Sequence, residues 1–277
     1  MKTLQQFLSE NRPLVMGILN TTPDSFSDGG RFNSTSAAVD HALCMVAQGA
    51  DMVDIGGEST RPGAAPVALE EEISRVIPVI EKIRQQSAVF ISVDTSKPEL
   101  MSLAIHAGAN MVNDVLALQA PGAVDICAQH KVAVCLMHMQ GEPRSMQHQP
   151  QYENVLLEIK TFLQQRLSDC VQAGIATENI VIDPGFGFGK SLQHNLLLLK
   201  KLDELAVIQQ PIMVGLSRKS MFGKLLNVEV HERLPASLAA AVLAYTNGAR
   251  IFRVHDVKAT LDVLRVCHAV STISNDL

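Results

Sequence analysis

The hydrophobic residues of the chain gather into eight short runs that are almost continuously apolar and rich in β-branched side chains. Strands buried on both faces show this pattern, whereas half-exposed strands alternate apolar and polar residues. We therefore expect eight buried strands, at residues 14–20, 52–57, 89–94, 111–115, 132–138, 180–185, 211–217 and 250–256.

Segments with helical signals separate these runs. After the third run, Thr95 or Ser96 can cap a helix, Pro98 fits its first turn, and Gly108 can end it. The segment 69–86 reads LEEEISRVIPVIEKIRQQ, and its early glutamates suit the first turn of a helix. Strands alternating with helices predict a parallel (βα)8 TIM barrel, as a single domain over residues 1–277.

Composition narrows the class of protein. A length of 277 residues suits one barrel, and 47% hydrophobic residues exclude a disordered chain. The net charge of −5 and the lack of a basic run argue against nucleic acid as a partner. There is no 20-residue apolar span and no secretory h-region, so we expect no membrane contact and a cytoplasmic location. Five cysteines without a C-x-x-C pair suggest reduced thiols used as small core residues.

The glycine-rich segment GFGFGKS, at residues 185–191, invites comparison with nucleotide-binding loops. A P-loop ending at Gly189 and Lys190 would need glycine at position 184, where the chain has Pro184. A dinucleotide fingerprint fails as well, because Lys190 occupies the place of its third glycine. No glycine fingerprint follows the first strand either, which argues against an open doubly wound sheet. We expect Lys190 to be solvated.

Polar residues cluster where the predicted strands end. Active sites of such barrels lie at the carboxyl ends of the strands. Any one of these residues could be a helix cap or turn residue, but chance caps would not fall so regularly at one end of one barrel. The residues are Asn20, Asp54, Asp94, Asn113, Asp114, His138, Asp183, Arg253, His255 and Asp256, followed after the seventh strand by Ser217, Arg218, Lys219 and Ser220.

Two kinds of chemistry can be separated within this set. Asp94, Asn113 and Asp183 offer planar hydrogen-bonding groups from three strands, which suit a flat heterocycle with amino and lactam edges. Arg253 and His255 lie two residues apart and therefore point the same way from a strand. With Arg61 from a loop, they suit a phosphate or diphosphate.

Seven segments in this order and spacing resemble the dihydropteroate synthase family, over residues 14–268. They are ILNTTPDSFSDGG, DIGGESTRPGA, SVDTSKP, CLMHMQG, DPGFGFGK, GLSRKSMFG and RVHDV. The resemblance implies that p-aminobenzoate is joined to a (7,8-dihydropterin-6-yl)methyl diphosphate, with release of diphosphate and formation of dihydropteroate. It also implies Mg2+ as cofactor, sulfonamides as inhibitors and a homodimer.

The resemblance assigns roles to individual residues. Asp94, Asn113, Asp183 and Lys219 are expected to hold the pterin ring in a pocket that Met137, Phe188 and Gly215 line, although Met137 and Phe188 could also be plain core. Asn20 is expected to bind Mg2+ on the diphosphate. Asp94, Asp183, Lys219 and Asn20 form the expected catalytic set. The remaining substrate-binding residues are Arg253, His255, Arg61 and Thr60 for the diphosphate and Ser220, Phe26, Arg61 and Pro62 for p-aminobenzoate.

The implied mechanism breaks the bond to diphosphate first and leaves a pterin-stabilised carbocation, which the amine of p-aminobenzoate attacks. Two other functions are weighed against it. A pterin-binding methyltransferase acting on methyl-tetrahydrofolate would not need the arginine–histidine pair, because it holds no diphosphate. A non-catalytic pterin-binding barrel would be expected to lack at least one of the site residues, and all are present.

Overall fold

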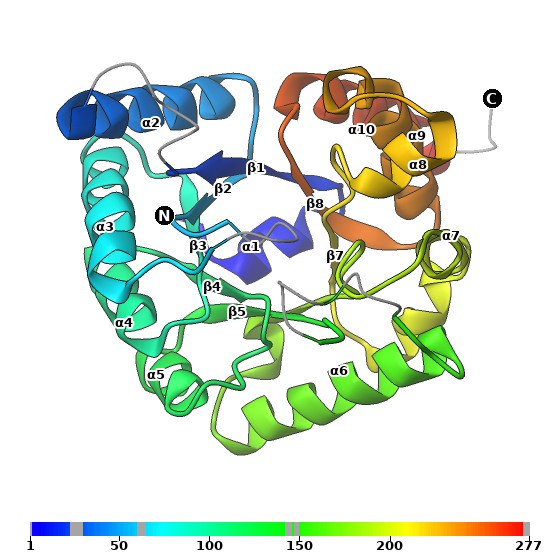
Figure 1. The fold of residues 1–277 in the computed structure, drawn as a ribbon, viewed down its shortest axis with the longest axis horizontal. Helices are drawn as coiled ribbons and strands as arrows, with labels where there is room; N and C mark the ends of the chain where they lie inside the picture. The colour runs from blue at the N-terminus through cyan, green and yellow to red at the C-terminus, as the bar shows by residue number, and fades with distance from the viewer. Residues whose placement is uncertain (1, 23–29, 60–64, 142–145, 147–149, 274–277) are drawn as a thin grey trace.

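Eight parallel strands close into a barrel in chain order, as Figure 1 shows end-on. This closed barrel of parallel strands confirms the predicted TIM barrel. The structure is a computed structural model that describes residues 2–22, 30–59, 65–141, 146 and 150–273. The strands are β1 Leu14–Asn20, β2 Met52–Gly56, β3 Phe90–Asp94, β4 Met111–Asp114, β5 Ala133–Met137, β6 Ile180–Asp183, β7 Ile212–Val214 and β8 Ala249–Val254.

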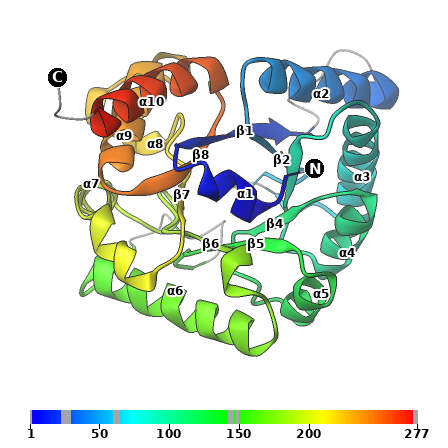
Figure 2. The same ribbon diagram turned by 180° about the vertical axis from the view of Figure 1, so that it is seen from behind.

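Helices surround the barrel on its outside (Figures 1 and 2). Each predicted strand lies in its place, but most are shorter than the apolar run that predicted them, because the runs continue into buried turns. The helices are α1 Leu4–Ser9, α2 Gly30–Ala47, α3 Leu69–Gln86, α4 Pro98–Ala107, α5 Ala123–His130, α6 Val155–Gln172, α7 Leu192–Lys200, α8 Ser220–Leu226, α9 Leu234–Thr246 and α10 Val257–Thr272, with 3-10 turns η2 Thr177–Asn179, η3 Leu202–Ile208 and η4 Val230–Glu232.

The core has two separate parts. The larger part lies between the barrel and the helices. The smaller part fills the barrel interior with apolar side chains from the amino-terminal halves of the strands, such as Met16, Met52 and Met111. Further along the same strands the inward side chains become polar, as at Asp54, Asp94 and Asn113. The barrel is thus a packed core at one end and a polar mouth at the other.

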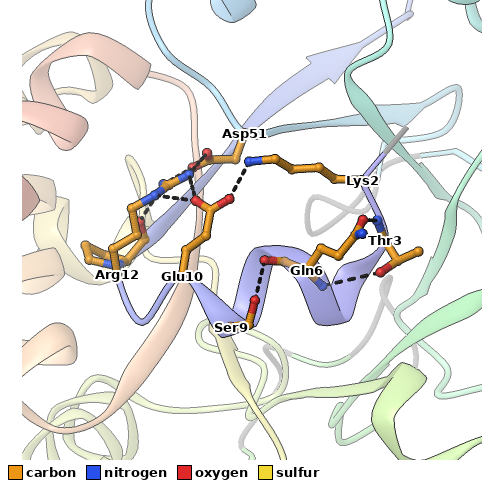
Figure 3. A network of polar contacts seen from close by, with 8 residues as sticks. Lys2, Thr3, Gln6, Ser9, Glu10, Arg12 and Asp51 are labelled. Atoms are coloured by element: carbon orange, nitrogen blue, oxygen red, sulfur yellow. Dashed lines mark hydrogen bonds and ion pairs between the residues drawn. The ribbon is translucent and has the colours of Figure 1, made fainter.

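Helix α1 closes the apolar end of the barrel, and Figure 2 shows it lying across that end. Its residues Leu4 and Phe7 belong to the interior core, and the ring of Phe7 meets that of Phe90 edge-on at 5.9 Å between centroids. A network of polar contacts holds the helix in place (Figure 3). There, Arg12 donates to both carboxylate oxygens of Asp51 at 2.7 and 3.0 Å and to Glu10 at 2.9 Å.

One expectation about the helices is wrong. Neither Thr95 nor Ser96 caps α4, because the capping position is Lys97; Pro98 in the first turn and the ending at Gly108, with φ +113°, are as predicted. The first turn of α3 is acidic, as predicted, and its Glu72 is 1% exposed and forms an ion pair with Lys97. The charge of Glu72 therefore joins α3 to the start of α4.

Two features of the described residues concern membrane spans and cysteines. None of the helices described is long and apolar enough to cross a membrane. All five cysteines lie in the described part of the chain and are free thiols. Cys127, Cys135 and Cys170 are buried, as expected for small core residues, whereas Cys44 is exposed.

Candidate active site

The strand register places several predicted site residues at one level of the mouth. Asn20 pairs with Gly56, Gly56 with Asp94, and Asp94 with Asn113. The absence of a side chain at Gly56 leaves space between Asn20 and Asp94, and a Cβ there would stand 3.4 Å from Cβ of Asp94. The arrangement therefore leaves a gap in which a ligand could approach both polar side chains.

Arg253 is the centre of a buried ionic network at the mouth. Its Nε donates to Oδ2 of Asp54 at 2.5 Å, and its Nη2 donates to Oδ2 of Asp94 at 2.6 Å. Nδ2 of Asn113 donates to the same Oδ2 of Asp54 at 3.1 Å. The network thus connects a residue predicted to bind an anion with two residues predicted to bind a flat ring.

The charges of this network depend on one another. Burial disfavours the charged form of Arg253, but the carboxylates of Asp54 and Asp94 outweigh it and raise the pKa of that guanidinium above its ordinary value. Burial raises the pKa of Asp94 to about 7, although the charge of Arg253 opposes the shift. Asp94 is therefore close to its titration point near neutral pH, a property typical of functional sites.

Asp183 and Lys219 form the opposite side of the mouth. Asp183 lies at the end of β6, is 4% exposed, and accepts a hydrogen bond from the backbone N–H of Gly185 at 2.7 Å. Burial lowers the pKa of Lys219 to about 8, against the attraction of Asp183. Nζ of Lys219 lies 4.2 Å from the centroid of the Phe188 ring, a cation–π contact.

Two further predicted residues border this side. A Cβ added to Gly215 would lie 4.0 Å from Oδ2 of Asp183, so this glycine keeps the space beside the carboxylate open. Met137 is 5% exposed at the end of β5 and pairs in register with Asp183. Both positions therefore border the space in front of Asp183.

The segment after β7 separates two neighbouring basic residues. Arg218 has φ +57° and forms an ion pair with Asp256 at 2.5 Å, away from Asp183. Nζ of Lys219 lies over the ring of Phe188 instead. Ser220 is exposed as the first residue of α8, next to Lys219.

His255 directly follows β8 and is held by Ser217, in the segment after β7. Oγ of Ser217 accepts from the backbone N–H of His255 at 3.2 Å and lies 3.0 Å from its Nδ1. This contact fixes the plane of the imidazole ring two residues beyond Arg253. The pair predicted to bind an anion therefore comes from one strand, with one member held by β2 and β3 and the other by the segment after β7.

The prediction that Lys190 is solvated is wrong. The side chain is 2% exposed, and its Nζ lies within 3.0 Å of the carbonyl oxygens of Gly185 and Phe188 and of Nδ1 of His138. Similarity to a nucleotide-binding loop bears on phosphate binding and not on burial. The ammonium group of Lys190 instead binds carbonyl oxygens of its own loop.

The role of Asp54 in this network could not be assigned from the sequence beyond its position near a strand end. One signal was present: Asp54 is a carboxylate in the middle of the apolar run MVDIG. It lies on the same face of β2 as Met52 and Gly56, which indicates a buried polar contact inside the barrel. Four predicted residues, Phe26, Thr60, Arg61 and Pro62, lie outside the described residues.

Among the described residues, no group of three or more His, Cys, Asp or Glu side chains is placed to hold a metal ion. The side-chain oxygen of Asn20, at the end of β1, is a hard ligand of the kind that Mg2+ accepts.

Comparison with known proteins places the chain in a family. The model of the pterin binding enzyme family matches residues 16–255. A dihydropteroate synthase from Escherichia coli K12 is 53% identical over 262 residues, which cover 95% of this chain and 93% of the relative.

Two solved structures have the same fold. A Yersinia pestis dihydropteroate synthase in a sulfonamide drug complex superposes with a TM-score of 0.91 at 50% identity, covering 95% of this chain and 96% of that one. A Xanthomonas albilineans dihydropteroate synthase with 4-aminobenzoic acid gives a TM-score of 0.90 at 50% identity, with 95% of each chain covered. The sequence match, the barrel and its polar mouth agree: the chain belongs to the pterin-binding enzyme family and, within it, to the dihydropteroate synthases.

Proposed function

We propose that the barrel mouth binds (7,8-dihydropterin-6-yl)methyl diphosphate with its ring among Asp94, Asn113, Asp183 and Lys219 and its diphosphate at Arg253 and His255, and couples it to p-aminobenzoate. The observation that carries the assignment is the network in which Arg253 bonds Asp94 and Asp54 while Asn113 bonds Asp54. In this network, a residue proposed to bind the diphosphate lies within hydrogen-bond distance of a residue proposed to bind the pterin ring.

The ring residues match the edges of a pterin. Carboxylates accept hydrogen bonds from paired N–H groups, an amide both donates and accepts, and an ammonium donates to a ring carbonyl or nitrogen. Asp94, Asn113 and Asp183 come from three different strands, so they surround a planar ligand rather than touch one edge. The Phe188 ring, with Lys219 over it, supplies an apolar wall.

Arg253 and His255 would bind the diphosphate and stabilise it as it leaves. The two ion pairs of Arg253 use two of its five N–H donors, so the guanidinium retains donors for phosphate oxygens. In the reaction, the methylene carbon–oxygen bond breaks and its electron pair leaves with diphosphate. The cation that remains on the pterin would lie beside Asp94 and Asp183, whose carboxylates would stabilise it when ionised.

The amine of p-aminobenzoate then attacks the methylene carbon and loses a proton, which completes dihydropteroate. We propose that Ser220, exposed beside Lys219, faces the carboxylate of p-aminobenzoate. Phe26, Arg61 and Pro62 are proposed to frame its ring, and Thr60 to lie near the diphosphate. The support for these four is the sequence resemblance alone.

Mg2+ is proposed as the cofactor, with Asn20 as its ligand from the chain. Mg2+ commonly takes one or two protein ligands and completes its shell with water and substrate phosphates, which fits a site with a single amide oxygen. The ion would neutralise charge that develops on the diphosphate. Sulfonamides are proposed as competitors of p-aminobenzoate, since one relative was solved with a sulfonamide and another with 4-aminobenzoic acid.

We also propose that the chain forms a homodimer. Large apolar side chains are exposed on the neighbouring helices α8, α9 and α10 (Figures 1 and 2), and a second copy could cover them. They are Leu225, Leu226, Leu243, Val266 and Val270.

The test is an assay of the purified chain with the dihydropterin diphosphate, p-aminobenzoate and Mg2+. Diphosphate and dihydropteroate should appear in equal amounts, and Asp183→Asn should lower their rate while the protein remains folded. Absence of both products with the folded chain would show the proposal to be wrong.

A further inference from the structure

Lys190 is a buried ionisable residue that the proposed chemistry does not use, and burial lowers the pKa of its ammonium group to about 7. Its Nζ lies 2.8 Å from the carbonyl oxygen of Gly185, 3.0 Å from that of Phe188, 3.0 Å from Nδ1 of His138 and 3.4 Å from the carbonyl oxygen of His138. An ammonium group has three donors, and it finds an acceptor for each of them. Lys190 therefore makes a satisfied buried site within its own loop.

His138 is suited to accept from this ammonium group. Burial, with the charge of Lys190 adding to it, lowers the pKa of His138 to about 3, so the imidazole is neutral. The ring packs edge-on against Phe162 with centroids 5.1 Å apart, which holds Nδ1 toward Lys190. A neutral histidine fixed in this way connects the loop after β6 to the end of β5.

The loop that Lys190 holds is tightly wound. Gly185, Gly187 and Gly189 have φ values of +71°, +81° and +61°, a region that favours glycine. A Cβ at Gly185 would lie 1.9 Å from the carbonyl oxygen of His138, and one at Gly189 would lie 2.3 Å from that of Gln140. The backbone of this loop thus lies directly against the end of β5, and its carbonyl groups need donors there.

Two other side chains, from outside this loop, also form hydrogen bonds with its backbone. The hydroxyl of Tyr152 donates to the carbonyl oxygen of Gly189 at 2.8 Å. The side chain of Asn195 accepts from the N–H of Gly187 at 2.7 Å and donates to the carbonyl oxygens of Lys190 and Ser191. Lys190 is the only described residue whose side-chain nitrogen contacts both Gly185 and Phe188 carbonyl oxygens, the two ends of the segment that faces the mouth.

This segment sets the position of three residues at the mouth. The N–H of Gly185 donates to Asp183, the ring of Phe188 lies under Nζ of Lys219, and a Cβ at Gly187 would touch Cδ of Lys219 at 3.2 Å. A shift of the loop would therefore move the hydrogen bond to Asp183 and the support of Lys219 together.

We infer that Lys190 is a positioning residue for pterin recognition, which fixes the Gly185–Phe188 segment through its three acceptors and so sets the geometry of Asp183, Phe188 and Lys219. The inference rests on the proposed function. It predicts that loss of the ammonium group weakens binding of the pterin half of the reaction and leaves the p-aminobenzoate half nearly unchanged, because no backbone hydrogen bond joins Ser220 to this segment among the described residues.

The first test is Lys190→Met, which keeps an unbranched stem as long as that of lysine up to Cε and removes the ammonium group with its donors. Calorimetry with the dihydropterin diphosphate and Mg2+, without p-aminobenzoate, should show Kd raised about tenfold or more, since small displacements of binding groups have large effects. The KM for p-aminobenzoate should change less than about twofold. The matched control is Lys200→Met, at the exposed end of the neighbouring helix α7, which should leave both values at those of the unchanged chain.

Lys190→Gln, which keeps an amide donor on a shorter stem, should have a pterin affinity between that of Lys190→Met and that of the unchanged chain. It replaces Lys190→Met as the deciding variant if the latter does not fold. A folded variant with unchanged pterin Kd, or equal losses for both substrates, would overturn the inference and leave Lys190 with a purely structural role. If the unchanged chain itself fails to bind the pterin diphosphate, the proposed function is at fault and not the role of Lys190.

Discussion

Nη2 of Arg253 donates to Oδ2 of Asp94 at 2.6 Å across the barrel mouth. The residue proposed to hold the leaving diphosphate is therefore bonded to one proposed to hold the pterin ring. A change in the charge of either side chain must alter the position of the other, because both are largely buried. Substitutions here are expected to affect both halves of the substrate.

Asp54 is the clearest case, since it has no proposed contact with substrate. It is fully buried and accepts from both Arg253 and Asn113 through the same oxygen. In Asp54→Asn, Arg253 would keep only Asp94 as a partner. We expect stability to fall by about 3 kcal/mol, because removal of one member of a buried ion pair leaves a charge poorly compensated. Urea unfolding of the two proteins measures the difference.

The matched control is Asp256→Asn, whose partner Arg218 is largely exposed. In Asp256→Asn, the free energy of unfolding should fall by less than about 1 kcal/mol. In Asp54→Asn, KM for the pterin diphosphate should also rise. Equal stability losses in the two variants would show that Asp54 is not central to the network.

The raised pKa of Asp94 gives a pH dependence that can be checked without substrate. Burial raises that pKa to about 7, so the folded chain keeps a proton on Asp94 at pH values where the unfolded chain has released it. The free energy of unfolding should therefore fall as pH rises from about 4 to about 7. Asp94→Asn has no carboxyl group to titrate at this position. Over the same range its free energy of unfolding should therefore fall by on the order of 2 kcal/mol less than that of the unchanged chain.

Thermal or urea unfolding at pH 5 and pH 8 gives the two slopes. Glu99→Gln, which removes a carboxylate on the outside of the barrel, should keep the slope of the unchanged chain. Parallel slopes for Asp94→Asn and the unchanged chain would mean that Asp94 is already ionised at pH 5.

The proposed Mg2+ ligand can be tested through metal dependence. A chelator should abolish turnover of the unchanged chain, and added Mg2+ should restore it. In Asn20→Ala, the Mg2+ concentration for half-maximal rate should rise by about tenfold, since the chain would lose its only proposed ligand while the diphosphate oxygens remain. The same Mg2+ dependence in both proteins would remove Asn20 from the metal site.

Much of the barrel could be predicted because parallel strands buried on both faces leave an almost continuous apolar signal, as in residues 14–20. The inward polar residues Asp94, Asn113 and Asp183 were predicted because each lies at or near the end of such a run. Lys190 was not, since its partners are backbone carbonyl oxygens that only the positive φ angles of Gly185, Gly187 and Gly189 bring together. Asp54 was given no role because its value depends on Arg253, which is 199 residues away in the chain.

The apolar end of the barrel should be separable from the chemistry. Phe7 of α1 packs edge-on against Phe90 beneath the interior core, at the opposite end of the strands from the mouth (Figure 2). In Phe7→Ala, we expect a loss of about 3 kcal/mol, because a buried ring is removed and a cavity remains. The kcat/KM of the folded fraction should stay within about twofold of the unchanged chain, since the described core cluster that Phe7 joins includes none of the proposed site residues. Leu8→Ala, at the partly buried edge of the same cluster, should cost less. A large loss of kcat/KM in fully folded Phe7→Ala would show that packing at the closed end controls the geometry of the mouth.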